Sequence, residues 1–124
     1  MLVAALMGVV LLGGLTVFQL QLIAGKPLGR FAWGGQHVVL PTRLRIGSAF
    51  AVVLYALFAV LMLQAAGAFS VLPDGAAAVG IWVLAGYLLF AAALNAASRS
   101  RPERLVMTPV TVALAAVCLT LALQ

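Results

Sequence analysis

Residues 25–45 read GKPLGRFAWGGQHVVLPTRLR and interrupt a chain that is otherwise almost continuously apolar. The stretch holds the only histidine, one of the two tryptophans and four of the seven basic residues. An uncharged apolar run, residues 2–24, precedes it, and a second run, residues 46–67, follows it. Each run reaches the roughly 20 residues that a helix needs to cross the hydrocarbon core of a bilayer. The stretch is therefore predicted to be a loop between two transmembrane helices.

Two further apolar runs, at about residues 76–97 and 105–123, complete the chain. Of its 124 residues 66% are hydrophobic and 7% are charged, whereas soluble proteins carry about 25% charged residues. The runs do not alternate between apolar and polar residues as the strands of a membrane barrel do. We therefore predict an all-α membrane protein, with residues 1–124 forming one transmembrane domain, an antiparallel four-helix bundle. Residues 2–24 lack the basic start of a signal peptide and are expected to remain as the first helix.

The basic residues predict the orientation of the bundle. They lie only between the first and second runs and between the third and fourth, at Lys26, Arg30, Arg43, Arg45, Arg99, Arg101 and Arg104. By the positive-inside rule both basic loops are expected in the cytoplasm and both termini outside. This indicates a multi-pass protein of a bacterial cytoplasmic (inner) membrane. The net charge of +5 favours anionic lipid headgroups on the cytoplasmic side as partners, and no nucleic acid.

Local signals predict where three of the helices begin. Ser100 and Glu103 fit the capping box S-x-x-E, which is expected to open the fourth helix. Asp74, within Pro-Asp-Gly, is a candidate N-cap of the third helix. Pro41 and Thr42 are likewise expected to mark the start of the second helix. Pro109 lies inside the last apolar run and predicts either a kink there or a helix that starts nearby.

The loop at residues 25–45 supplies the first group of candidate lipid- or ligand-binding residues: Arg30, Trp33, Gly34, Gly35, His37, Arg43 and Arg45. One interpretation is an interfacial anchor, with the aromatic ring at headgroup depth and basic side chains on phosphates. The other is a lid whose glycine N–H groups bind an anion. Because the glycine spacing matches no phosphate-binding fingerprint, the anchor is the preferred interpretation.

A second group of candidates is polar and lies toward the same end of the predicted helices: Gln19, Tyr87, Asn95, Ser98, Glu103 and Arg104. If the faces that carry these residues converge, they form a polar vestibule capped by the two basic loops. The simpler alternative is polarity close to the headgroups, or hydrogen bonds between helices. Glu103 itself is expected to act as a helix cap and as a local counter-ion for its neighbouring arginines.

The absence of certain residues from the predicted transmembrane helices restricts the possible functions. No charged residue lies inside any span, which disfavours ion-coupled transport. One histidine and one cysteine make no metal site, and no cofactor or catalytic residue is predicted. The leading hypothesis is a non-catalytic module that binds lipid or a partner, either a second copy of the chain or another membrane protein. A small-solute transporter or facilitator using the vestibule is the alternative, and a membrane-embedded lipid-modifying enzyme using His37, Glu103 and the arginines is the weaker one.

Two motifs also carry a family resemblance. The first, G-x-P-x-G-x-x-A-x-G-G followed by L-P, comprises Gly25, Pro27, Gly29, Ala32, Gly34, Gly35, Leu40 and Pro41. The second, N-x-x-S-x-S-x-x-E-R, comprises Asn95, Ser98, Ser100, Glu103 and Arg104. In both, the chain resembles a family of small bacterial four-helix membrane proteins without an established function. Many members have Thr-Pro-Ser in the turn at residues 97–100, so that turn is expected to differ here. The resemblance implies the bundle and the importance of the two loops, and it implies no reaction.

Overall fold

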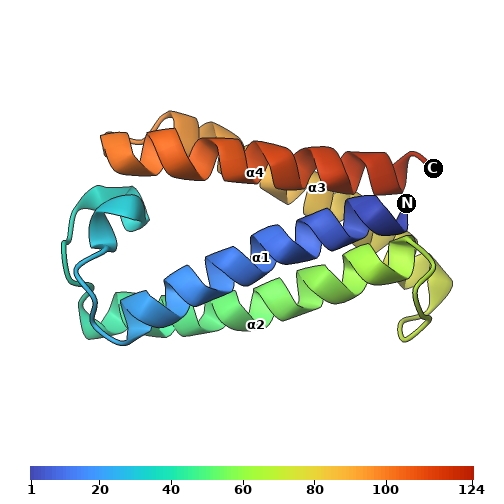
Figure 1. Cartoon of the computed structure of the whole chain (residues 1–124), viewed down its shortest axis with the longest axis horizontal. Helices are drawn as coiled ribbons and strands as arrows, with labels where there is room; N and C mark the ends of the chain where they lie inside the picture. The colour runs from blue at the N-terminus through green and yellow to red at the C-terminus, as the bar shows by residue number, and fades with distance from the viewer.

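The computed structural model describes all 124 residues, and its regular structure is entirely helical. Its four α-helices are α1 (Leu2–Ile23), α2 (Thr42–Ala65), α3 (Asp74–Ala96) and α4 (Arg101–Ala122). Figure 1 shows them running side by side in alternating directions, so that both termini lie at one end of the bundle. We call this the terminal end, and the opposite end, with the two basic loops, the loop end. All four helices are long and apolar enough to cross a membrane, which confirms the predicted four-helix membrane bundle.

Helices α2 and α4 begin earlier than their apolar runs predicted. Helix α2 begins at Thr42 and not at Ile46, directly after the extended backbone of Pro41. Helix α4 begins at Arg101 and not at Leu105. Basic side chains can lie along a helix with their charged ends in water, so charged residues need not end it. The first turns of both helices therefore carry basic residues.

The helix starts also refine the predicted caps. The side chain of Ser100 accepts a hydrogen bond from the backbone N–H of Glu103 at 3.5 Å, which is one half of the capping box. The other half does not form, because the N–H of Ser100 donates to Oγ of Ser98 and not to Glu103. Asp74 is the first residue of α3 and not its N-cap, since Pro73 takes that position and no side chain caps the helix. Helix α4 continues through Pro109, so the alternative of a start near that residue is wrong.

The helices pack as two close pairs. Helix α1 packs most extensively against α2, and α3 against α4, while the contacts between the two pairs are fewer. Close approach depends on Gly8 of α1, because a Cβ atom there would lie 2.6 Å from the sulfur of Met62. The buried apolar core fills the half of the bundle toward the terminal end: Ala5, Leu12, Leu61, Met62, Ile81, Leu84, Ala85, Leu88, Leu114, Ala115, Val117, Cys118 and Leu121.

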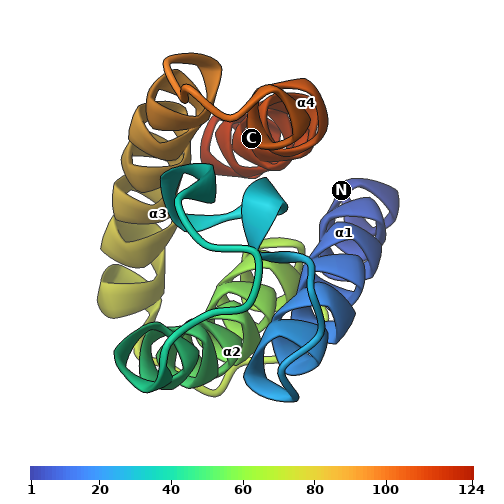
Figure 2. The ribbon, with the colours of Figure 1, turned by 90° about the vertical axis from the view of Figure 1, so that its left-hand side faces the viewer.

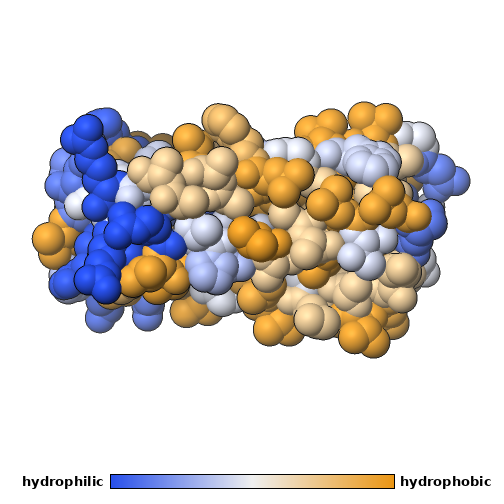
Figure 3. Space-filling view, turned by 90° about the horizontal axis from the view of Figure 1, so that it is seen from above, coloured by the Kyte–Doolittle hydropathy of each residue, from blue (hydrophilic) through white to orange (hydrophobic).

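The surface separates by polarity along the length of the bundle. Figure 3 shows hydrophobic residues along the sides of the helices and the strongest concentration of hydrophilic residues at the loop end. Many large apolar side chains are exposed on all four helices, as expected of surfaces that face lipid. Both basic loops lie at the loop end, which is compatible with the positive-inside rule. Which side of the membrane this end faces stays a prediction.

Candidate functional site

The loop between α1 and α2 folds back over the bundle, and we call its residues 25–41 the lid. Figure 2 views the loop end and shows the lid lying across it, between the α1–α2 pair and the α3–α4 pair. Two short 3₁₀ turns, η1 (Gly29–Phe31) and η2 (Trp33–Gly35), shape the lid. The N–H of Gly29 donates to the carbonyl of Val38 at 2.8 Å and closes the lid on itself. The lid is thus a folded element with its own hydrogen bonds.

Two contacts tie the lid to the start of α4. The backbone N–H of Gly34 donates to Oε2 of Glu103 at 2.9 Å. The hydroxyl of Ser100 donates to the carbonyl of Arg30. Gly35 lies against the same serine, since a Cβ atom on Gly35 would be 2.6 Å from its Oγ. The capping residue and the carboxylate of α4 therefore both hold the lid.

Trp33 ties the lid to α2. Its indole Nε1 donates to Oγ of buried Ser48 at 3.5 Å. The ring rests on Gly47, where a Cβ atom would lie 2.9 Å from two ring atoms. Trp33 has a φ of 53°, and the following Gly34 and Gly35 are also left-handed. A left-handed conformation costs a non-glycine residue on the order of 1–3 kcal/mol and persists only where surrounding contacts impose it. The contacts with α2 supply that constraint.

Beneath the lid lies a chamber of about 190 Å³, lined by residues of all four helices and of the lid and partly open to the surface. Two hydrogen bonds between helices cross its walls: Gln19 Nε2 donates to the hydroxyl of Tyr55 at 3.2 Å, and Asn95 Nδ2 donates to Oγ1 of Thr111 at 3.2 Å. These polar side chains meet apolar and aromatic ones. The lining residues are Leu15, Phe18, Gln19, Phe31, Ala32, Trp33, Tyr55, Tyr87, Ala91, Asn95, Glu103, Met107 and Thr111.

Two polar groups of the chamber are incompletely satisfied. Oε1 of Gln19 is buried and has no hydrogen-bond partner. Glu103 is 8% exposed, and no lysine, arginine or histidine forms an ion pair with it. Its predicted role as a counter-ion for neighbouring arginines is therefore wrong, because its carboxylate turns inward to the lid and the chamber. Burying an unpaired charge or an unpartnered amide is unfavourable, so both groups have capacity for a further partner.

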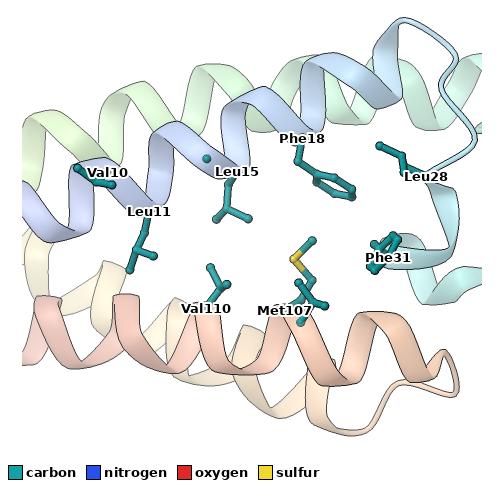
Figure 4. A pocket seen from close by; sticks show the side chains of 10 residues that line it. Val10, Leu11, Leu15, Phe18, Leu28, Phe31, Met107 and Val110 are labelled. Atoms are coloured by element: carbon teal, nitrogen blue, oxygen red, sulfur yellow. The ribbon is translucent and has the colours of Figure 1, made fainter.

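An apolar groove of about 370 Å³ runs between α1 and α4 and meets the chamber. Figure 4 shows side chains of both helices projecting toward one another across it, with Phe31 of the lid at one end. The groove and the chamber share four lining residues: Leu15, Phe18, Phe31 and Met107. Phe18 and Phe31 meet edge to face at this junction, with ring centroids 6.4 Å apart. A partly polar chamber and an apolar groove thus lie side by side, with these four side chains between them.

The structure brings together some of the sequence-predicted residues and separates others. In the chamber lie Gln19, Trp33, Tyr87, Asn95 and Glu103, with Gly34 bonded to the last of these. The remaining candidates lie outside it and mostly support the loops: Arg30, Gly35, His37, Arg43, Arg45, Ser98 and Arg104. For example, the guanidinium of Arg45 donates to the carbonyl of Leu40 at 3.1 Å. The guanidinium of Arg104 donates to the carbonyl of Ser98 at 3.0 Å. A vestibule forms, and the basic side chains do not line it.

Sequence reasoning missed two polar residues of the chamber, Tyr55 and Thr111. Tyr55 follows Ser48 by seven positions, which places both on one face of α2. That spacing was the available signal. Thr111 gives no such signal, because its hydroxyl also bonds the carbonyl of Met107 in its own helix, as threonines commonly do in apolar helices.

The arrangement is suited to binding. The chamber lining contains no histidine, cysteine or lysine, and the chain has no group of three or more metal-ligating side chains. Amides, phenols and one carboxylate can orient a polar group by hydrogen bonds.

No protein-family model matches this chain, and neither does any curated protein or solved structure.

Proposed function

We propose that this protein is a non-catalytic membrane module that binds one amphiphilic molecule taken from the bilayer. The polar head of that molecule occupies the chamber, and its apolar chain lies in the groove between α1 and α4. The observation that carries the proposal is that the two spaces adjoin one another and share four lining residues. The groove volume of about 370 Å³ is within the roughly 300–1,000 Å³ of typical ligand sites.

The basic loops fit the same proposal as surface contacts. Arg30 of the lid and Arg43, two residues after the lid ends, are exposed and, in the proposed cytoplasmic orientation, would meet anionic headgroups. Their part is to seat the protein in the membrane, while the chamber selects the ligand. A homo-oligomer or a partner membrane protein is compatible with this assignment.

The other hypotheses receive less support from the geometry. A solute crossing the bundle would have to pass 13 buried apolar residues that fill its terminal half. An enzyme that combines His37 with Glu103 would need both at one site, and only Glu103 lines the chamber. Binding is the function that the side chains support best.

Two neighbouring glycines of α1 offer a matched test. Gly14 lines the groove, Gly13 does not, and a Cβ atom at either position would meet no other atom within 4 Å. Gly14→Leu should therefore fill the groove without disturbing the core, and Gly13→Leu should add the same side chain elsewhere on the helix. Native mass spectrometry of the proteins purified in mild detergent should show one retained amphiphile in the parent and in Gly13→Leu, and none in Gly14→Leu. A bare parent protein, or equal retention in both variants, would refute the proposal.

A further inference from the structure

The charge inside the chamber is opposite to the charge of the loops around it. Glu103 is the only charged residue among the 13 that line the chamber. The seven basic residues of the chain all lie in the loops or first helical turns of the loop end, and none lines the chamber. The site within the membrane protein is therefore acidic, although the net charge of the chain is +5.

The buried carboxylate has only partial compensation. Its hydrogen-bond partners are the Gly34 N–H, at 2.9 Å, and the Ser98 side chain, and it lies in the first turn of α4, where the helix dipole favours an anion. None of these contacts supplies a full positive charge, and no basic side chain forms an ion pair with it. A ligand that carries a cation would complete the site.

Aromatic rings surround the same space. Five of the 13 lining residues are aromatic: Phe18, Phe31, Trp33, Tyr55 and Tyr87. The faces of such rings attract ammonium groups, and sites for quaternary ammonium ligands are commonly built from several rings. An anionic head would be repelled by the carboxylate. The aromatic lining and the acidic group thus favour the same ligand charge.

From these observations we propose that the ligand is an amphiphilic cation, with an amine or quaternary ammonium head beside Glu103 and its apolar chain in the groove between α1 and α4. This inference rests on the proposed function, since it identifies the class of amphiphile that the site binds. The amide of Gln19, whose Oε1 lacks a partner, provides a further hydrogen bond to an amine head. Phe18 and Phe31 stand at the junction, where the head of the ligand joins its chain.

A series of compounds with one chain and four heads tests the inference. The protein in nanodiscs is titrated below micellar concentrations with tetradecyltrimethylammonium, tetradecylphosphocholine, tetradecyl maltoside and tetradecyl sulfate, and binding is followed by native mass spectrometry. The alkylammonium ion should bind most tightly and the sulfate most weakly. If the phosphocholine binds as tightly as the alkylammonium ion, the source of the cation is a zwitterionic lipid head. If the phosphocholine binds more weakly, a singly charged amphiphile is the ligand.

Glu103→Gln is the decisive variant, because it removes the charge and keeps an oxygen that can accept the bond from Gly34. This variant should bind the alkylammonium ion about tenfold or more weakly than the parent does, and its affinity for the maltoside should be unchanged. Asp74→Asn, which removes the other acidic side chain of the protein, is the matched control and should change neither affinity. Equal binding of cation and maltoside, unaffected by Glu103→Gln, would overturn the cation assignment and leave the proposed function standing. Failure of all four compounds to bind would overturn both.

Discussion

The attachment of the lid can be tested with two adjacent glycines that share one backbone conformation. Gly34 and Gly35 have φ values of 74° and 72°. An alanine at either position pays a similar cost for the left-handed conformation, on the order of 1–2 kcal/mol. Their surroundings differ, because a Cβ atom on Gly34 meets nothing within 4 Å, whereas one on Gly35 lies 2.6 Å from Oγ of Ser100 and 3.2 Å from the carbonyl oxygen of Arg30. The difference between the two variants therefore isolates the contact of the lid with α4.

The magnitude follows from the rigidity of that contact. Ser100 caps α4, so its Cβ atom is fixed by the backbone and cannot rotate away. Overpacking of this kind costs about 1–3 kcal/mol, and the lid should open roughly fivefold to 150-fold more often in Gly35→Ala than in Gly34→Ala. Amide hydrogen exchange of the protein in nanodiscs measures this opening at the N–H of residue 34, which bonds Glu103, and at that of Gly29. Equal rates of amide exchange in the two variants would show that Gly35 does not pack closely against Ser100 of α4.

Two further predictions concern the terminal half of the bundle. Gly8→Leu should lower the thermal stability of the purified protein by about 1–3 kcal/mol, because the new side chain would displace Met62, whereas Gly86→Leu, at a position with open space, should leave it unchanged. Equal melting temperatures would refute that packing. Gln64→Leu should make the loop between α2 and α3 more sensitive to protease, because the amide makes three hydrogen bonds with the backbone of Val71 and Leu72, each contributing about 0.5–1.5 kcal/mol. Gln64→Glu, which keeps the acceptor oxygen, should be cleaved at an intermediate rate, and unchanged cleavage of Gln64→Leu would contradict the role of the amide.

Hydropathy was sufficient to predict the fold. Backbone groups in lipid must form their hydrogen bonds within the protein, so a long apolar run has few stable structures other than a helix. The starts of α2 and α4 follow the local signals at Pro41 and Ser100 and not the limits of the apolar runs. The apolar run gave Ile46 for α2, but the backbone is already helical at Thr42 because Pro41 sets the start. The positions of charged residues indicate where the chain leaves the apolar core of the membrane, but they do not locate the first residue of a helix.

The chamber was only partly predictable, because it depends on which faces of separate helices meet. Tyr87 and Asn95 were predicted to share a polar vestibule, and both line the chamber. The inward turn of Glu103 could not be foreseen from the sequence around it, where Arg101 and Arg104 are the nearest charged residues. It depends on the lid folding back to bring the N–H of Gly34, 69 positions away, within 2.9 Å.

Glu103 bonds the lid and, in the proposed complex, also contacts the head of the ligand. Gly34 bonds Oε2 alone, whereas a carboxylate offers about four acceptor positions. A cationic head can therefore bind the carboxylate without displacing the lid. Such a head also compensates a charge whose burial otherwise opposes closure, so a bound cation should stabilise the closed lid in proportion to its occupancy. Slower exchange of the Gly34 amide on adding tetradecyltrimethylammonium, and no change with the maltoside, would show this coupling. Faster exchange would mean instead that ligand and lid compete for the same oxygen, and that the lid opens when the site fills.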